Sequence, residues 1–497
     1  MAIVGIDIGT STAKVFAFDP QGNVLAYARE SYGINRPNIG WAEQDPRVWW
    51  QAITSGMRTV AKQLSKMGQT IESIGLSGQM HGPVLLDKDG VPLLPCPIWM
   101  DTRAQKQAEF INELLGHEAL LSITGNLAVP AFPAAKLLWI RENLPRIFKK
   151  IRWVLMPKDY IGFCLTQTIA TDHSDASGTL LYDIKARTWS DDLVQVIGLE
   201  RDCLPPLICS TQVLGKLTPE AARDLSLDAD IPVVMGAGDL ITSAIGTGAV
   251  QPGKVSLILG TAGQLLAYTE VVPVELLGKF YVFAHAIPAA NLLLGTLPTG
   301  GAALAWVAKW WSKKEDVDAT DFANVINLAK QSLPGAHGLI FVPYLAGTGT
   351  PHMDYTLTGA FVGLTENHGI AEIVRAVLEG VAYALRDSLE VLRKSGLPIA
   401  ELRLAGGAIK SDAWAQIITD VFALPLHLLN VLDASPLGAF ILAATATGHY
   451  NHLQEACDRV IFSKKVFTPT RHSELYGKMY KRFQQVRDAL RICKNSN

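Results

Sequence analysis

The first apolar segment of the chain contains a carboxylate. Residues 3–8 read Ile-Val-Gly-Ile-Asp-Ile, and Gly-Thr-Ser-Thr follows directly. An unpaired charge inside a buried strand is very costly, so Asp7 must either shift its pKa or find a cation or hydrogen-bond donors. The segment predicts a strand over 3–8, a tight turn over 9–12 and a second strand over 14–19. The cost is tolerable if the first strand ends here and Asp7 faces a functional cleft.

A second segment has the same pattern near the middle of the chain. Residues 255–259 form an apolar run, Gly260-Thr261-Ala262-Gly263 follow, and residues 265–269 are apolar again. A repeated strand–turn–strand unit in a chain of 497 residues indicates two related lobes. We place the division after residue 247, which gives an N-terminal lobe over 1–247 and a C-terminal lobe over 248–497.

The remaining pattern alternates strands, glycine-rich turns and helices. Apolar strands are predicted over 71–76, 231–235, 402–404 and 425–429, and helices over 48–66, 104–115, 134–143, 412–422 and 436–447. Such units predict an α/β chain with mixed layers, in which ligands bind at the ends of strands.

Charge and cysteine usage restrict the class of protein. The formal net charge is −2 without a basic run, which argues against a nucleic-acid surface. The six cysteines are scattered and match no zinc-site spacing, so we expect free thiols in a reducing cytosol. We find no signal peptide and no apolar run long enough to span a membrane, and therefore expect a cytoplasmic protein without a membrane partner.

The two glycine-threonine turns suit phosphate binding. Phosphates need closely approaching backbone N–H groups and hydroxyls, which Gly9–Thr12 and Gly260–Gly263 both supply. Either turn alone is more often an ordinary hairpin turn, but two in matching contexts, one beside Asp7, favour a phosphate site. Asp7 would then act on a Mg²⁺ ion, with water between them. The chain lacks a Walker A motif, a complete G-x-G-x-x-G, H-E-x-x-H and G-x-S-x-G.

Three further segments carry reactive or polar groups. Asp239 ends the run Gly236-Ala-Gly-Asp at a strand end, where a general base could meet a small substrate, although it could instead cap a helix. The loop 77–82 contains His81, which could equally be a structural histidine. The segment 99–103, Trp-Met-Asp-Thr-Arg, could bind a ligand or only cap a helix through Asp101 or Thr102, with a surface arginine.

Taken together, these motifs resemble the FGGY family of carbohydrate kinases, and within it the xylulokinases. The matches run in order along nearly the whole chain, and the loop 77–82, Ser-Gly-Gln-Met-His-Gly, is the most specific of them. The others are the phosphate turns 7–12 and 260–261, the Trp-Glu-Gln region 40–50, the helix signature 136–139, the catalytic-base segment 236–239, the C-terminal signature 359–364 with 375–381, and the adenosine loop 406–411.

The resemblance implies a fold and a reaction. The fold would be the two-lobed actin-like ATPase (ribonuclease H-like) fold, each lobe a mixed sheet flanked by helices, with the active site in the cleft between them. Asp239 would be the catalytic base, and Asp7 would act through Mg²⁺ on the phosphates of ATP. The expected sugar contacts are Gln79, Met80, His81, Trp99 and Asp101. The expected nucleotide contacts are Thr10, Ser11, Thr12, Gly260, Thr261, Gly301, Gly407 and Ser411.

Three positions depart from the xylulokinase pattern. Leu240 follows the expected base where asparagine is usual, Met100 replaces asparagine, and Asp433 begins a run that usually begins with glutamate. A lost polar partner at a sugar hydroxyl can change selectivity by orders of magnitude. The expected reaction converts D-xylulose to D-xylulose 5-phosphate.

Two alternative functions remain open from the sequence. The first is a kinase for another sugar, polyol or aldonate, such as ribulose, L-xylulose, gluconate or a glycerol-like acceptor. The second is an actin-like ATPase that has no sugar substrate. Dimers are common in the family, so a homodimer is the oligomeric state to test.

Overall fold

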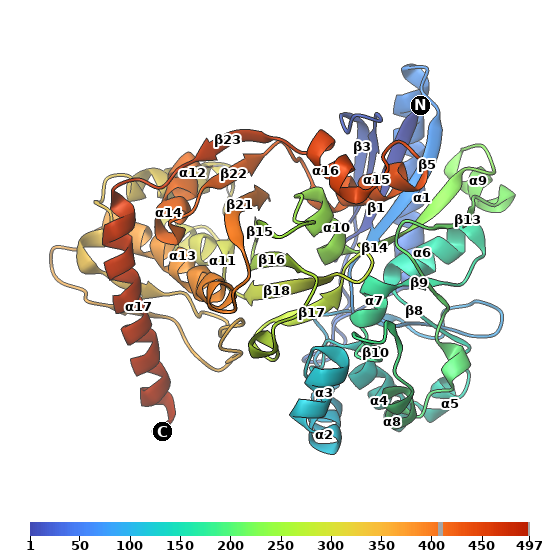
Figure 1. Ribbon diagram of the computed structural model, residues 1–497, viewed down its shortest axis with the longest axis horizontal. Helices are drawn as coiled ribbons and strands as arrows, with labels where there is room; N and C mark the ends of the chain where they lie inside the picture. Colours follow the sequence, from blue (N-terminus) through green and yellow to red (C-terminus); the bar gives the residue numbers. More distant parts are fainter. Residues whose placement is uncertain (406–410, 496–497) are drawn as a thin grey trace.

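A computed structural model describes residues 1–405 and 411–495 of the chain. Two large sheets organise it, one of six strands and one of seven. Figure 1 shows the first sheet on the right and the second on the left, with helices around both. The predicted mixed α/β layers are therefore present.

The first sheet places three strand ends at one edge. Strands β1, β5 and β14 are parallel, whereas β2, β3 and β13 run antiparallel to their neighbours. The C-terminal ends of the three parallel strands therefore lie together, and the expected base and sugar loop follow two of them. In order across the sheet, the strands are β13 (Val213–Lys216), β14 (Pro232–Gly238), β5 (Ile71–Gly78), β1 (Ala2–Ile8), β2 (Thr12–Phe18) and β3 (Val24–Ser31).

The second sheet repeats this arrangement. Its strands β15, β21 and β22 are parallel, and β15 forms an antiparallel hairpin with β16. The hairpins β1–β2 and β15–β16 thus hold equivalent places in the two sheets, which confirms the internal repeat. Across the sheet, the strands are β17 (Tyr281–Ala284), β18 (Asn291–Leu297), β16 (Gly263–Thr269), β15 (Gly253–Leu259), β21 (Ile399–Ala405), β22 (Leu426–Leu429) and β23 (Ser463–Phe467).

Helices cover both sheets. The first sheet is covered by α1 (Pro46–Lys66) beside β2 and β3, and by α15 (Ala434–Ala446) beside β1 and β5. The second sheet is covered by α13 (Ile370–Lys394), against which α14 (Asp412–Phe422) and the long α17 (His472–Asn495) pack. Figure 1 shows α17 running along the left lobe to the C-terminus.

Helices α10 (Asp239–Gly246) and α15 cross in very close contact between the lobes. A Cβ atom on Gly438 would lie 1.9 Å from the carbonyl oxygen of Thr242, and one on Gly246 would lie 2.0 Å from that of Ala434. Glycine is therefore required at both positions for this backbone approach. Because α15 comes from the C-terminal half but covers the N-terminal sheet, the chain crosses between the lobes more than once, and a division after residue 247 remains a prediction.

Insertions between the sheet strands complete the lobes. The helices at the lower right of Figure 1 lie between β5 and β13 in the sequence. The remaining helices are α2 (Gln105–Leu115), α3 (His117–Thr124), α4 (Pro133–Asn143), α5 (Pro145–Phe148), α6 (Pro157–Thr166), α7 (His173–Ser177), α8 (Asp191–Ile197), α9 (Pro219–Leu225), α11 (Gly301–Ser312), α12 (Ala319–Ala329) and α16 (Leu453–Val460). Short strands pair as β4 (Glu43–Gln44) with β7 (Cys96–Pro97), β6 (Val84–Leu86) with β8 (Trp153–Leu155), β9 (Thr171–Asp172) with β12 (Leu207–Ile208), β10 (Tyr182–Asp183) with β11 (Thr188–Trp189), and β19 (Ile340–Val342) with β20 (Ala360–Val362).

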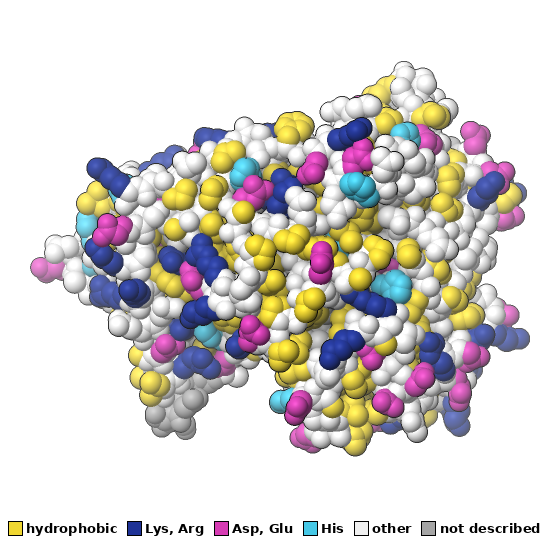
Figure 2. Space-filling view, in the orientation of Figure 1, with side chains coloured by type: hydrophobic (Ala, Val, Ile, Leu, Met, Phe, Trp, Pro, Cys, Tyr) yellow, Lys and Arg dark blue, Asp and Glu magenta, His cyan; other side chains and the backbone are white. Residues whose placement is uncertain are grey.

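The surface carries mixed charge. On the face shown in Figure 2, basic and acidic side chains are interspersed. In the described part of the chain, no helix combines the length and apolar character needed to cross a bilayer.

Candidate active site

Asp7 finds both kinds of partner that its burial requires. It is 2% exposed and lies opposite Lys14 on β2 and opposite Ser77 on β5. The Lys14 ammonium is 3.2 Å from Asp7 Oδ2, and the Ser77 hydroxyl donates to Asp7 Oδ1 at 2.9 Å. The carboxylate therefore sits near the end of its strand with one cation and one donor in contact, which makes its burial tolerable.

Asp239 is the first residue of α10, directly after β14. Gly238 takes the N-cap position, so Asp239 is not the helix cap that the sequence also allowed. Burial and the nearby Asp7 carboxylate raise the pKa of Asp239 to about 7. A carboxylate poised near neutral pH beside a second carboxylate is suited to general base chemistry.

A chain of hydroxyls joins the two carboxylate positions. The Ser77 hydroxyl lies 2.7 Å from that of Thr242. Because Ser77 gives its proton to Asp7, Thr242 supplies the proton of this contact, and its oxygen lies 3.1 Å from the backbone carbonyl oxygen of Asp239. Ser77 thus contacts both Asp7 and the first turn of α10, which connects the two expected catalytic residues.

Lys14 also reaches the C-terminal half of the chain. Its ammonium lies 3.1 Å from the Asp433 carboxylate, which Arg29 contacts at 3.3 Å. Asp433 occupies the N-cap position of α15, but its carboxylate serves this ion pair. Asp433, one of the positions that differ from the xylulokinase pattern, is therefore linked to Asp7 through Lys14. Sequence reasoning missed Lys14 because its role depends on strand pairing.

His81 lies in the loop after β5, and a hydrogen bond holds its ring. Nδ1 of His81 lies 2.7 Å from the carbonyl oxygen of Gly178, and burial lowers the pKa of His81 to about 4. The ring is therefore neutral near pH 7, with Nδ1–H donating and Nε2 able to accept a hydrogen bond. Phe132 and Phe283 flank it at centroid distances of 5.0 and 5.6 Å. Met80 is buried beside Gly238, the residue before Asp239.

Trp99 links the expected sugar and phosphate segments. Its side chain is 46% exposed, and its indole Nε1–H donates to the Thr10 hydroxyl at 2.9 Å. Ser11 continues the same turn, and Thr12 begins β2. The predicted contacts Trp99 and Thr10 are therefore brought together, although they were assigned to different ligands.

Asp101 and Gln79 have structural partners in this conformation. Asp101 is 0% exposed and pairs with Arg103 at 2.7 Å, and Arg103 stacks 3.6 Å from the ring centroid of Trp41. Arg103 is thus not the surface arginine that the sequence also allowed, and α2 begins after Ala104 rather than at Asp101. The Gln79 amide donates to Gln44 at 2.9 Å, and its oxygen has no hydrogen-bond partner among the described residues. Their sugar contacts remain predictions.

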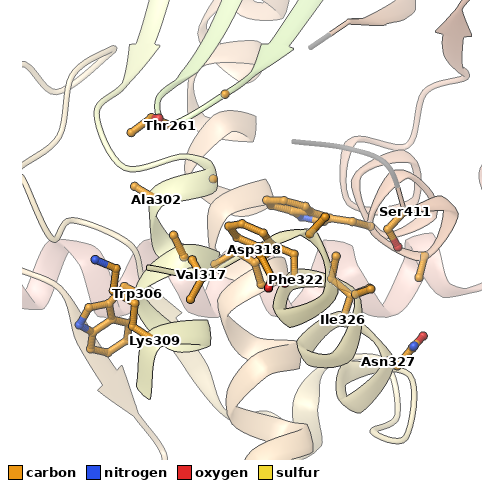
Figure 3. A pocket seen from close by; sticks show the side chains of 18 of the residues that line it. Thr261, Ala302, Trp306, Lys309, Val317, Asp318, Phe322, Ile326, Asn327 and Ser411 are labelled. Atoms are coloured by element: carbon orange, nitrogen blue, oxygen red, sulfur yellow. The ribbon is translucent and has the colours of Figure 1, made fainter. Parts of the chain in front are cut away.

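A pocket of about 1110 Å³ gathers the expected nucleotide residues of the C-terminal lobe. Gly260, Thr261, Gly301 and Ser411 all line it. Figure 3 shows Thr261 and Ser411 on opposite sides of the pocket. Ser411 is the N-cap of α14, and its side chain makes no capping bond to any described residue, so the hydroxyl can serve a ligand. Gly407 lies outside the described residues.

The rest of the pocket was not found from the sequence. Helices α11 and α12 supply an apolar wall between Thr261 and Ser411 (Figure 3), which suits the flat face of a base. No short motif marks these residues, because they come from helical insertions. They include Ala302, Trp306, Lys309, Val317, Phe322, Ile326 and Asn327. Thr10, Ser11 and Thr12 are absent from this lining as the described residues define it.

We expect Gly300→Ala to weaken ATP binding. The Gly301 N–H donates to the carbonyl of Gly260 at 2.8 Å, so the turn 260–263 rests on the start of α11. A Cβ on Gly300 would lie 2.6 Å from backbone atoms of Ala262 and Gly263 and would displace that turn. The KM for ATP should rise about tenfold with little change in the KM for the acceptor. Gly477→Ala is the control, because nothing lies within 4 Å of its new Cβ; equal ATP KM values in both variants would refute this account of the turn.

The residues present suit Mg²⁺ held mainly by phosphates and water. In residues 1–405 and 411–495, no group of three or more His, Cys, Asp or Glu side chains could hold a metal ion. Mg²⁺ usually binds through one or two carboxylates together with phosphate oxygens and several waters. Asp7, which lies close enough to Asp239 to raise its pKa, provides that kind of donor.

Family models match both halves of the chain. The N-terminal domain of the FGGY family of carbohydrate kinases matches residues 2–246, and its C-terminal domain matches residues 257–447. The chain is 37% identical over 456 residues to a xylulose kinase of Escherichia coli strain K12, covering 91% of each protein.

Solved structures give the same relation. A "xyloylose kinase" from Brucella ovis is 33% identical and superposes with a TM-score of 0.91, covering 99% of this chain and 100% of that one. A gluconate kinase from Lactobacillus acidophilus is 27% identical, with a TM-score of 0.91 over 98% of each chain.

Proposed function

This chain belongs to the FGGY family of carbohydrate kinases, and we propose that it transfers the γ-phosphate of ATP to D-xylulose, giving D-xylulose 5-phosphate. The observation that carries the proposal is the set of groups at the C-terminal edge of the first sheet: Asp239 with its raised pKa, Asp7, and the Met80–His81 loop beside Gly238. The similarity to the xylulose kinase of Escherichia coli supports the choice of sugar.

In the proposed mechanism, Asp239 accepts the proton of the attacking hydroxyl. Phosphoryl transfer asks the protein mainly for in-line positioning and for neutralisation of charge. Asp239 begins α10, whose position is fixed through Thr242 and Ser77, so the base is held steady beside the acceptor. The neutral His81 ring can accept a hydrogen bond from a sugar hydroxyl through Nε2.

In this proposal, the C-terminal lobe binds ATP and Asp7 binds the metal ion. The pocket between Thr261 and Ser411 would hold the nucleoside, and Gly260 and Thr261 would hold phosphates. When bound, Mg²⁺ neutralises phosphate charge. Asp7 would hold it through water, and Lys14, already 3.2 Å from Asp7, compensates the same carboxylate. Lobe closure would exclude water, which otherwise competes as the acceptor.

Gluconate is the second candidate acceptor. A gluconate kinase superposes on the chain as well as a xylulose kinase does, with a TM-score of 0.91 in both cases. Leu240 next to the proposed base lacks the amide that xylulokinases usually have there. The two structures therefore support both acceptors equally by shape.

We expect the acceptor kcat/KM to depend on pH through Asp239. A general base acts in its ionised form, so activity is full above its pKa and falls as the pH drops through it. With a pKa of about 7, kcat/KM should fall about tenfold per pH unit on the acid side. ADP should be measured directly by chromatography, since coupling enzymes have their own pH dependence. A flat profile between about pH 5 and pH 8 would argue against this base.

An acceptor screen tests the proposed function. ADP release is measured with ATP and Mg²⁺ alone, and then with ketoses, polyols and aldonates, including D-xylulose, L-xylulose, ribulose, gluconate and glycerol. The proposal expects the highest kcat/KM with D-xylulose. A higher value with gluconate would assign the second candidate, and ATP turnover that no acceptor raises would favour an ATPase without a sugar substrate.

A further inference from the structure

Lys136 is a buried lysine for which the described residues provide no carboxylate at salt-bridge distance. It lies on α4, is 1% exposed, and forms no salt bridge with any described residue. Burial lowers the pKa of its ammonium to about 7. A buried amine destabilises the fold unless its N–H groups find acceptors. A leucine or methionine would pack at this position without that cost, so a lysine here indicates a role for its hydrogen bonds.

The Lys136 ammonium joins two loops that lie apart in the sequence. It donates to the carbonyl oxygen of His81 at 2.7 Å and to that of Ile98 at 2.8 Å. The first carbonyl belongs to the loop after β5. The second closes the turn that carries Trp99, since the Asp101 N–H also donates to Ile98.

The backbone of His81 needs such support. His81 has φ +70°, a left-handed conformation that a residue with a side chain adopts at a cost. Its ring is held by the carbonyl of Gly178, and its own carbonyl is held by Lys136. These two bonds hold the residue so that Nε2, which has no hydrogen-bond partner among residues 1–405 and 411–495, can meet a ligand.

We propose that Lys136 is a positioning residue for the acceptor: it holds the His81 loop and the Trp99 turn at a fixed separation, so that both face one sugar. The proposal rests on the proposed function, because it takes His81 and Trp99 as sugar contacts. Lys136 itself touches no substrate in this account. Its loss therefore weakens acceptor binding and leaves the nucleotide pocket on the other lobe unchanged.

Arg141 offers a matched control on the same helix. Its guanidinium donates to two backbone carbonyls, those of Val196 at 3.1 Å and Ile197 at 2.7 Å. It thus ties α4 to α8 in the same way that Lys136 ties α4 to the two loops. Arg141→Met removes a cation that bonds two carbonyls, but away from His81 and Trp99.

The test compares Lys136→Met with Arg141→Met. For each, kcat, the KM for the best acceptor of the wild type, the KM for ATP, acceptor-independent ATP hydrolysis and the melting temperature are measured. In Lys136→Met, the acceptor KM should rise at least about tenfold, because both hydrogen bonds that hold the two loops are lost, while the ATP KM and the background hydrolysis should stay within about twofold. Arg141→Met should leave both KM values within about twofold whatever its melting temperature.

An unchanged acceptor KM in Lys136→Met, or acceptor and ATP KM values that rise together in both variants, would overturn the positioning role. If Lys136→Met does not fold, Lys136→Gln, which keeps an amide donor, is measured by the same criteria. Failure of the proposed function is seen separately, because then no acceptor raises ADP release by the wild-type enzyme.

Discussion

Asp239→Asn should lose nearly all acceptor-dependent ATP turnover while still binding ATP and the acceptor. Asparagine has the same shape but cannot accept the hydroxyl proton, and a positioned base contributes about 10²–10⁴-fold to such a step. The position of residue 239 at the start of α10 is fixed through Thr242 and Ser77, so the backbone should not move. Turnover is measured by ADP release, and binding by calorimetry.

The control for this variant is Asp191→Asn. Asp191 also stands in the first turn of a helix, but its side chain is 87% exposed and lies on α8. Turnover by this variant should equal that of the wild type. A positioned base contributes at least about a hundredfold, so an Asp239→Asn variant that kept roughly a tenth or more of the wild-type kcat would refute the role of base.

Asp7→Asn should give the second largest loss. The substitution leaves an oxygen to accept from Ser77 but removes the charge that faces Lys14 and, in the proposed mechanism, the Mg²⁺ ion. The kcat should fall about 10²–10³-fold, as for loss of an electrostatic contact made in the transition state, and more Mg²⁺ should be needed to reach half-maximal rate. The measurement is kcat at ATP saturation over a Mg²⁺ series.

The control for Asp7→Asn lies at the other end of the same hairpin. Asp19 accepts from the N–H groups of Gln21 and Asn23 in the turn after β2. Asp19→Asn should change stability at most, with normal Mg²⁺ dependence. Equal Mg²⁺ dependence and kcat in Asp7→Asn and the wild type would show that Asp7 plays no part in phosphate chemistry.

Short-range patterns were enough to predict the regular elements near the two turns. The expected helix over 412–422 matches α14, and the expected strands over 3–8 and 71–76 lie within β1 and β5. These elements have strong periodicity and glycine-rich boundaries. The two-lobed α/β fold inferred from the ordered motifs is confirmed by the family matches and by the superposition on the Brucella ovis structure.

Contacts made across strands could not be read from the sequence. The pairing that sets Lys14 and Ser77 on either side of Asp7 depends on the register of β1 with its hairpin partner β2 and with β5, which is distant in the chain. Asp101 is a second example. Its sugar contact stays a prediction, but no local pattern indicated its partners in the fold, where its carboxylate pairs with Arg103 and accepts from the Ala42 N–H at 2.7 Å.

The apolar wall of the nucleotide pocket escaped prediction for another reason. Phe322 and Ile326 lie four residues apart on α12, a spacing that is equally typical of an ordinary core face, and Val317 precedes the helix. Only the packing of α12 beside the turn at Thr261 and the start of α14 turns that face into a lining (Figure 3). The glycine turns, by contrast, were noticed because a turn that binds phosphate would accept only a few residue types.

The most direct test of the account is phosphorus NMR of the wild-type enzyme with ATP, Mg²⁺ and D-xylulose. The account predicts one phosphomonoester signal, coupled to the two protons of the sugar C5 carbon, growing in step with ADP. Inorganic phosphate appearing in step with ADP, with the sugar unchanged, would contradict it.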